Sequence, residues 1–377
     1  MNVYFDNAAT TRVRHEAAER MCRVMEECYG NPSSTHEMGR QAKKELDLAR
    51  EQVAGAIGAK PEDVYFTSGG SEADNWAIAG LEKLTFRRGK HVITTAVEHD
   101  AVRRPMERLA DQGWEITWLK PDGDGRIAAE DFENALRPDT VFASVMLVNN
   151  ETGAVNPVGE MAAAIRRRKT GTILHTDAVQ GLCKVPINVR KLGADLISLS
   201  SHKICGPKGC GALYISPGVK LPPLILGGGQ EKGRRAGTEA MPAIAGFAEA
   251  VRLGMAEMDE TTERMRRLRD WLAEAVPAQI PGAVIIGKGD APHILSLSLP
   301  GYRSEVLMNC LEQDGISVSK SSACKKGGRS HVLEAMGLPD RVIDGALRVS
   351  FSRYSTQEEA AYFLQRLRAA AERLIHT

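Results

Sequence analysis

Two polar side chains follow predicted buried strands in the middle of the chain. Asp177 ends the segment 174–177, which reads LHTD, and Lys203 ends the segment 200–203, which reads SSHK. Open α/β sheets bind their ligands at the carboxyl ends of the strands. A lysine amine there can form a Schiff base, and a buried carboxylate needs a cationic partner such as a protonated ring nitrogen. Taken singly, each residue has a commoner explanation, as a solvated lysine or as an aspartate that caps a turn.

A third segment could bind phosphate. Residues 66–72, FTSGGSE, run from a predicted strand through Gly69 and Gly70 into a predicted helix. Backbone N–H groups and hydroxyls at a helix N-terminus can bind a phosphate group. The spacing matches neither the nucleoside triphosphate loop nor the dinucleotide-binding motif. The alternative that Ser71 only caps the helix stays open.

The three segments together predict one cofactor. The phosphate segment, Asp177 and Lys203 occur in this order on successive strand–helix units. Pyridoxal 5'-phosphate requires a phosphate anchor, a counter-ion for its ring nitrogen and a lysine amine. His99 and Asn150 each follow a further predicted strand. An imidazole can stack on the ring, and an amide can hydrogen-bond the ring oxygen.

A cysteine lies in a small, polar and cationic stretch near the C-terminus. Residues 319–330 contain Cys324 together with Lys320, Lys325 and Lys326. Nearby cations lower the pKa of a thiol and raise its thiolate fraction. The alternative is a solvated lysine loop with an incidental cysteine, but exposed cysteines are uncommon. We therefore expect Cys324 to be a reactive thiol in a loop.

The elements that position these residues can be read from the hydrophobic pattern. Short apolar runs alternate with amphipathic helical segments, which is typical of strand–helix units in a mainly parallel sheet. Seven strands are expected at 63–67, 91–95, 115–119, 141–148, 172–176, 195–200 and 211–215. Helices are expected at 72–83, 101–112, 130–136 and 159–169.

The pattern changes in the last third of the chain. A long helical region is expected from 242 to 275, where it would connect two lobes. Beyond it, residues 293–299, 316–319 and 346–351 alternate polar and apolar side chains, as strands do when one face meets solvent. The predicted fold class is therefore α/β, with a large lobe around a mainly parallel seven-stranded sheet and a smaller α+β lobe.

Composition excludes several classes of protein. The chain has 377 residues with a net charge of +1 and 43% hydrophobic residues, as expected for a globular protein of two lobes. No excess of positive charge favours direct binding of nucleic acid. The N-terminus lacks a signal-peptide pattern and the longest apolar run, around 145–148, cannot span a bilayer, so we expect a cytoplasmic protein without membrane contact. Seven cysteines without a CxxC pair predict neither a disulfide framework nor a metal site.

Four motifs give the chain a family resemblance. They are YFDNAATT at 4–11, GNPSS at 30–34, SSHK at 200–203 and SAC at 322–324. Together they resemble the cysteine desulfurases of nitrogen fixation and iron–sulfur cluster assembly. These are class V, fold-type I pyridoxal phosphate enzymes. The resemblance covers essentially the whole chain, with the motifs in order.

The resemblance implies roles for individual residues. Lys203 would form the Schiff base with the cofactor, His99 would stack on its ring and shuttle protons, and Cys324 would take up sulfur. The residues implied to bind the cofactor are Gly70, Ser71, His99, Asn150, Asp177, Gln180, Ser200, His202 and Lys203, with Thr238 reaching the phosphate in the neighbouring subunit. Arg348 would bind the substrate carboxylate, with Asn31 and Asn150 also contacting substrate.

The resemblance also implies an architecture and an activity. Residues 13–257 would form the large pyridoxal phosphate-binding domain, and residues 1–12 with 258–377 would form the small domain that carries Cys324. Two copies would assemble as a homodimer. The enzyme would convert L-cysteine to L-alanine, leaving a persulfide on Cys324. The sulfur would then pass to an acceptor protein: an iron–sulfur scaffold, a tRNA-thiolation enzyme or a sulfur carrier.

Two other functions remain as alternatives. A related pyridoxal phosphate enzyme, such as a selenocysteine lyase or an aminotransferase, would not need Cys324, and the cationic cysteine stretch counts against it. A non-catalytic scaffold for sulfur trafficking would not need Lys203, Asp177 and His99 together with Cys324. Nucleic-acid binding through the cations at 166–169 is weaker still, because the helix dipole favours cations in a last helical turn.

Overall fold

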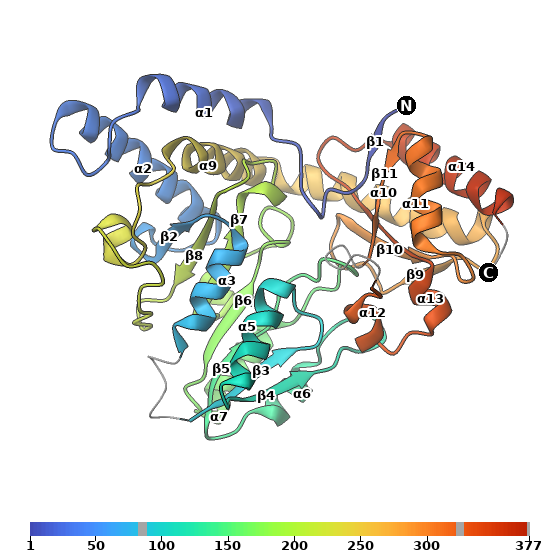
Figure 1. Ribbon diagram of the computed structural model, residues 1–377, viewed down its shortest axis with the longest axis horizontal. Helices are drawn as coiled ribbons and strands as arrows, with labels where there is room; N and C mark the ends of the chain where they lie inside the picture. The colour runs from blue at the N-terminus through green and yellow to red at the C-terminus, as the bar shows by residue number, and fades with distance from the viewer. Residues whose placement is uncertain (82–88, 322–327, 375–377) are drawn as a thin grey trace.

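The computed structural model describes residues 1–81, 89–321 and 328–374. Figure 1 shows two groups of elements side by side. The large lobe comprises a seven-stranded sheet with helices α1 to α9, and the small lobe comprises helices α10 to α14 with a four-stranded sheet. No helix in the described ranges is long and apolar enough to cross a membrane.

The central sheet is mainly parallel, as predicted. Its strands are β2 (Val64–Thr67), β3 (His91–Thr95), β4 (Glu115–Leu119), β5 (Thr140–Ser144), β6 (Ile173–Asp177), β7 (Leu196–Ser200) and β8 (Gly211–Ile215). They lie in the order β2-β8-β7-β6-β5-β3-β4. β8 pairs antiparallel with both β2 and β7, and all other pairs in the sheet are parallel. The predicted strands agree with these bounds to within one residue, except in one place.

The strand expected at 141–148 ends early, at Ser144. The following apolar residues are buried, and the N–H groups of Val145 and Leu147 still donate to the carbonyl oxygens of His175 and Asp177 in β6, so only the side that faces away from β6 leaves the ladder. Instead, side chains bind it: the N–H of Met146 donates to Glu98, and its carbonyl oxygen accepts from Asn156. The apolar composition of this run correctly predicts that it is buried. The conformation of its backbone depends instead on hydrogen bonds with buried polar side chains.

Helices cover both faces of the sheet. They are α1 (His15–Glu27), α2 (Glu37–Ala56), α3 (Gly70–Ala79), α5 (Asp100–Asp111), α6 (Ala129–Ala135), α7 (Val158–Arg168), α8 (Val189–Leu192) and α9 (Met241–Ala256), with short 3-10 turns at Pro61–Asp63, Ser201–Lys203 and Gln230–Gly233. Alternate residues of one strand point to opposite faces. Thus Tyr65 packs with Trp76 of α3 in one core, while Val64 and Phe66 lie in another core with α2 and α9.

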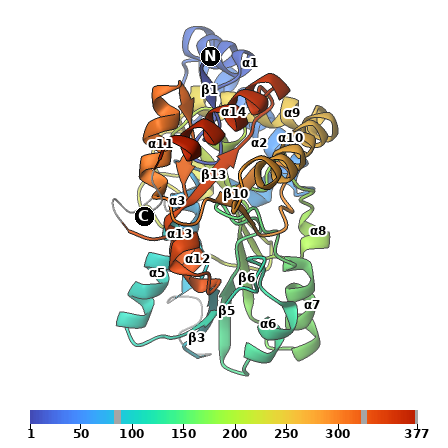
Figure 2. The ribbon, with the colours of Figure 1, turned by 90° about the vertical axis from the view of Figure 1, so that its right-hand side faces the viewer.

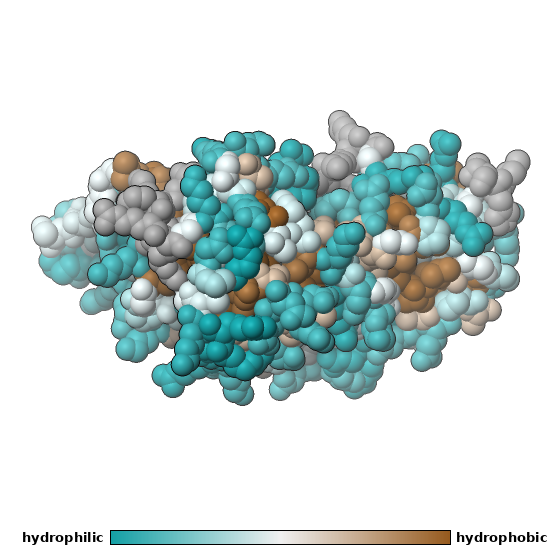
Figure 3. All heavy atoms as spheres, turned by 90° about the horizontal axis from the view of Figure 1, so that it is seen from below, coloured by the Kyte–Doolittle hydropathy of each residue, from teal (hydrophilic) through white to brown (hydrophobic). Residues whose placement is uncertain are grey.

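The small lobe has its own core. Its elements are α10 (Met258–Gln279), β9 (Val284–Ile286), β10 (Ile294–Ser298), α11 (Ser304–Gln313), β11 (Ile316–Ser317), β12 (Ser319–Lys320), α12 (His331–Ala335), α13 (Asp340–Asp344), β13 (Ala346–Ser350) and α14 (Gln357–Arg373). The antiparallel sheet has the order β12-β13-β10-β9. Figure 2 shows α10, α11 and α14 packed around it. Hydrophilic side chains cover most of the face in Figure 3, so apolar residues reach that surface mainly in recesses.

The N-terminal segment belongs structurally with the small lobe. Its strand β1 (Val3–Tyr4) pairs in parallel with β11, and Phe5 packs against Phe351 and Phe363. The long helix expected at 242–275 is two helices, because the backbone turns at Glu257 between α9 and α10. The domain limits at 12/13 and 257/258 stay a prediction.

A buried ion pair anchors the strand that leads into the phosphate segment. Arg50 of α2 makes two bonds to Glu231, at 2.6 and 2.7 Å, and a third to the carbonyl oxygen of Val64. Glu231 also accepts the backbone N–H of Phe66 at 2.9 Å. These contacts fix β2 just before the chain turns at Gly69 into α3.

Replacing Arg50 by leucine should destabilise the fold by about 3–5 kcal/mol, because it leaves the Glu231 carboxylate buried without its cation. Urea unfolding measures this loss of free energy. Arg252→Leu is the matched control, since its pair with Glu249 is half exposed and such pairs contribute less than about 1 kcal/mol. Equal losses in the two variants would contradict the anchoring role.

Candidate active site

A cavity of about 350 Å³ lies at the carboxyl ends of β6 and β7 and is also lined by Arg348 of β13. Most of the residues predicted from the sequence line it: Gly70, Ser71, His99, Asn150, Asp177, Gln180, Ser200, His202, Lys203 and Arg348. They come from both lobes and from segments far apart in the chain. The topology therefore brings these predicted residues to one cavity.

Lys203 is a buried amine held by backbone carbonyls. It lies in the short helix directly after β7. Its Nζ donates hydrogen bonds to the carbonyl oxygens of Ala8 at 2.5 Å and Ala9 at 2.7 Å. Burial, together with the like charge of Arg348, lowers the pKa of this amine to about 7. Near neutral pH a large share of Lys203 is therefore uncharged, which is the nucleophilic form of an amine.

Two buried carboxyl groups line the cavity. Asp177 ends β6, and one of its oxygens accepts the N–H of Val179 at 2.9 Å. The Oδ1 of Asp74, from α3, lies 3.5 Å from Nε2 of His175 but forms no hydrogen bond with any described residue. Burial raises the pKa of Asp177, and burial with the charge of Asp177 raises the pKa of Asp74 well above its usual range. A cationic group of a ligand would relieve this unfavourable burial of negative charge.

The start of α3 can receive an anion. The helix begins at Gly70 and no side chain caps it, and Ser71 lies inside the first turn, which excludes a capping role for Ser71. The hydroxyl of Ser200 is buried and has no partner among the described residues. A Cβ at Gly70 would come within 2.6 Å of the Cγ2 of Val179, so a larger residue here would have to displace that side chain. Unpaired N–H groups and hydroxyls thus line the cavity here.

His202 contributes a neutral imidazole next to this anion-binding part. Burial is the main cause that lowers the pKa of His202 to about 4, and the charge of Lys203 adds to it. Its Nδ1 lies 3.2 Å from the hydroxyl of Thr10. A neutral ring can donate one hydrogen bond and accept another.

His99 and Gln180 are each oriented by hydrogen bonds to neighbouring protein groups. His99 caps α5, where its Nδ1 accepts the N–H of Ala101 at 3.1 Å. The proton of the neutral ring is then on Nε2. The Nε2 of Gln180 donates to the carbonyl oxygen of Ala8 at 2.9 Å, and its Oε1 lies 3.1 Å from Nε2 of His293. Both cavity-lining side chains are therefore fixed without a ligand.

Arg348 is a buried guanidinium with a free donor. It lies in β13 and is only 1% exposed. Two of its nitrogens donate to the carbonyl oxygen of Asn150 and to a carboxylate oxygen of Asp6, both at 2.9 Å. Its Nε has no partner in the described part of the chain. A carboxylate would satisfy that donor, and guanidinium groups suit such ligands.

Three predicted site residues do not line this cavity. Asn31 is exposed in the loop between α1 and α2, at the outer edge of the large lobe (Figure 1). Thr238 is exposed in the loop before α9. Cys324 lies outside the described residues. The roles assigned to these three residues stay predictions.

Sequence reasoning missed five residues that line the cavity: Ala8, Ala9, Asp74, Met146 and Val179. Ala8 and Ala9 act through their carbonyl oxygens, and Lys203 is 195 and 194 residues away from them in the chain. No local pattern encodes such a contact. Asp74 did leave a signal, because it is an acidic residue within the otherwise apolar buried face of α3.

Comparisons of the sequence and of the structure with known proteins point to the same family. The family model described as aminotransferase class-V matches residues 3–363. The cysteine desulfurase IscS of Methanosarcina thermophila is 42% identical over 367 residues, covering 96% of this chain and 90% of that one.

Solved structures agree with this match. A structure described as a NifS-like protein superposes with a TM-score of 0.94 at 38% identity, covering 99% of this chain and all of that one. A structure described as SspA in complex with cysteine superposes with a TM-score of 0.82 at 31% identity, covering 94% of this chain and all of that one. These matches confirm the predicted resemblance and its fold class. The chain therefore belongs to the class V aminotransferase family, among the cysteine desulfurases.

Proposed function

We propose that this enzyme is a pyridoxal phosphate-dependent cysteine desulfurase. It would convert L-cysteine to L-alanine and leave the sulfur as a persulfide on Cys324. The observation that carries the proposal is the single cavity in which the amine of Lys203, the carboxyl of Asp177 and the guanidinium of Arg348 meet. The relatives named as cysteine desulfurases support the choice of reaction.

The residues of the cavity fit pyridoxal phosphate. The uncapped start of α3 and the unpartnered hydroxyl of Ser200 would bind its phosphate. Asp177 would pair with the protonated ring nitrogen, which would relieve the burial of its charge. Lys203 would attach to the aldehyde through its uncharged amine, and His99 would stack on the ring. When bound, the cofactor supplies an electron sink that makes the α-proton of an amino acid acidic.

The chain's own groups would bind the substrate and move its proton. The free Nε of Arg348 would bind the carboxylate of L-cysteine, and Asn150 and Asn31 would contact its polar groups. Lys203 would take the α-proton, because its lowered pKa lets it accept and return a proton near neutral pH. The structure described as SspA in complex with cysteine supports L-cysteine as the ligand.

The sulfur step would belong to Cys324. Its thiolate would attack the sulfur of the substrate, so that an S–S bond forms and the C–S bond breaks. The electron pair of that C–S bond stays with the substrate, which leaves as L-alanine after it is protonated. The reaction is balanced: L-cysteine and one enzyme thiol give L-alanine and one enzyme persulfide. An acceptor protein, such as an iron–sulfur scaffold, a tRNA-thiolation enzyme or a sulfur carrier, would then take the sulfur.

A homodimer would complete the site. Thr238 and Asn31 are exposed and lie outside the cavity of their own chain. Exposed apolar side chains accompany them: Tyr29 is 71% exposed near Asn31, and Leu226 is 79% exposed in a loop whose neighbour Ile225 pairs with Arg235. This supports a second copy of the chain that covers these side chains. Thr238 of one copy would then contact the cofactor phosphate bound in the other copy. The cytoplasmic location stays a prediction.

Replacing Cys324 by alanine should lower sulfide release from L-cysteine by about 100-fold or more, because the nucleophile is lost. The enzyme is reconstituted with pyridoxal phosphate, and sulfide is measured in the presence of a reductant. Cys22→Ala is the control, since this thiol is exposed on α1, and it should keep full activity. Full release by the Cys324 variant would instead indicate a lyase that does not use this thiol.

The attachment of pyridoxal phosphate to Lys203 should depend on pH with a midpoint near 7. Below this pH the amine is protonated and the rate should fall about tenfold per pH unit, and above it the rate should level off. Absorbance stopped-flow on the cofactor-free protein measures the rate. Arg348→Met should move the midpoint upward, because it removes a like charge, whereas Arg266→Met on α10 should not. A rate that keeps rising to pH 10 would show an ordinary lysine.

A further inference from the structure

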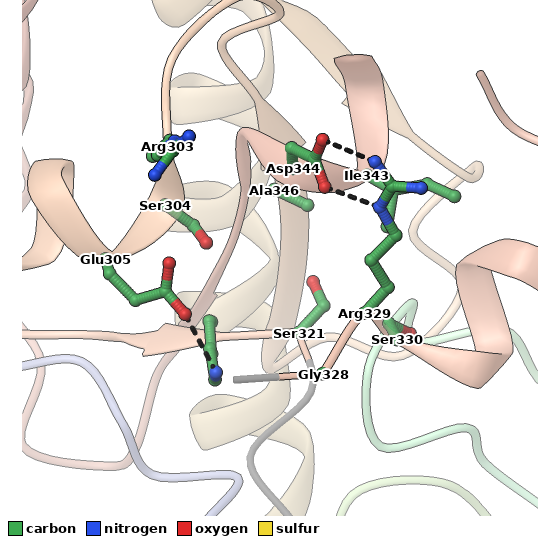
Figure 4. A pocket seen from close by; sticks show the side chains of 11 residues that line it. Arg303, Ser304, Glu305, Ser321, Gly328, Arg329, Ser330, Ile343, Asp344 and Ala346 are labelled. Atoms are coloured by element: carbon green, nitrogen blue, oxygen red, sulfur yellow. Dashed lines mark hydrogen bonds and ion pairs between the residues drawn. The ribbon is translucent and has the colours of Figure 1, made fainter. Parts of the chain in front are cut away.

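A second cavity, of about 260 Å³, lies in the small lobe. Its walls are the start of α11, the end of β12 with Ser321, the residues 328–330 and the end of α13. Figure 4 shows the hydroxyls of Ser304 and Ser321 pointing into the space between Glu305 and Arg329. None of these residues lines the cavity around Lys203.

The lining of this second cavity has one more cation than anion, and Arg329 also pairs at 2.7 Å with Asp340 beside it. Lys320 pairs with Glu305 at 3.0 Å, and Arg329 holds Asp344 through two bonds of 2.7 and 2.8 Å. The guanidinium of Arg303 forms no ion pair or hydrogen bond with the residues that the structure describes, although, after Arg329, its charge also lowers the pKa of Asp344. The lining therefore carries one net positive charge, and two carboxylates within it would repel a dianion.

The start of α11 adds further donors. This helix has ten residues, and its N-cap residue Arg303 supplies no side-chain cap. The first backbone N–H groups of a helix point outward, and its dipole favours negative charge there. Ser304 lies at this point and lines the cavity.

Ser321 is an independent indication of a ligand. It is 3% exposed, and its hydroxyl has no hydrogen-bond partner in the described part of the chain. A buried hydroxyl without a partner is unfavourable. An oxygen ligand in the cavity would satisfy it together with Arg303 and the start of α11.

We propose that this cavity binds a carboxylate, contributed by an acidic side chain of the protein that accepts sulfur; this rests on the function proposed above. A carboxylate balances the one net positive charge of the lining. The volume is several times the roughly 30 Å³ of one water molecule, so it accommodates a glutamate side chain rather than only a bare ion.

The position in the chain links this cavity to sulfur transfer. Ser321 immediately precedes the segment that contains Cys324, and Gly328 immediately follows it. A partner side chain seated here would therefore lie beside both points at which that segment leaves and rejoins the described chain. An acceptor that docks through this carboxylate is held beside the two described residues, Ser321 and Gly328, that flank the segment containing Cys324 in the sequence.

Direct binding tests the site without any turnover. The holoenzyme is titrated with N-acetyl-glutamate amide, its glutamine counterpart and inorganic phosphate, and binding is followed by calorimetry. The glutamate probe should bind at least about tenfold more tightly than the glutamine probe, because a charge-assisted hydrogen bond is at stake. Arg303→Gln and Ser321→Ala should weaken it, Arg303→Lys should keep part of it, and Arg266→Gln should leave it unchanged. Equal binding of the two amides, an unaffected Arg303→Gln variant or tighter binding of phosphate would each overturn the carboxylate site.

Transfer of sulfur tests the acceptor role separately. Synthetic peptides with one cysteine and one glutamate, or glutamine in its place, serve as acceptors. The glutamate peptides should have a lower KM in the wild type, and this advantage should vanish in Arg303→Gln, while sulfide release to a small reductant stays unchanged. Carboxylate binding without any difference between the peptides would overturn the acceptor role. Absence of sulfide release in the wild type would overturn the desulfurase function itself. The binding measurement would still show whether the cavity takes a carboxylate, because it does not depend on turnover.

Discussion

The site depends on the two hydrogen bonds that the Lys203 amine donates to the carbonyl oxygens of Ala8 and Ala9. They satisfy an amine that is buried at the end of β7, and they draw the N-terminal segment across the cavity. The same segment is fixed on both sides, because Thr11 bonds the carbonyl oxygen of His202 and Ala8 accepts Gln180. The large lobe is therefore joined to the N-terminal segment of the small lobe by one continuous group of hydrogen bonds around the cavity.

Burial and the charged groups around the cavity together determine the pKa of Lys203. Lys203, Lys184 and Arg348 are close enough that the two other cations lower the pKa of Lys203, while Asp177 and Asp6 oppose them. Lys184 is itself buried and donates to the carbonyl oxygen of Lys203. The protonation of Lys203 thus depends on the charges of these neighbours. Burial of Lys203 near other cations favours its uncharged amine, and the same arrangement keeps the Nε of Arg348 free for a ligand.

The elements of the large lobe could be predicted because their signals are local. Strand ends such as Asp177 and Lys203 follow apolar runs directly, and parallel strands bring such ends to one edge. The early end of β5 could not be predicted, since Glu98, which accepts the N–H of Met146, lies 48 residues away in the chain. The break at Glu257 was equally hidden, because both flanking sequences favour helix. Ala8 and Ala9 act through their backbone, which no side-chain pattern can reveal.

The pairing of β1 with β11 has a consequence for how the molecule is made. Asn7 bonds to Ser350, which is 343 residues further along the chain. A ribosome releases the N-terminal strand first, but its partners in the small lobe emerge last. The large lobe can close around its own contacts earlier, whereas the small lobe and the site between them must wait for the end of synthesis. Such non-local closure slows folding, so the cavity around Lys203 closes only after Arg348 of β13 has been synthesised.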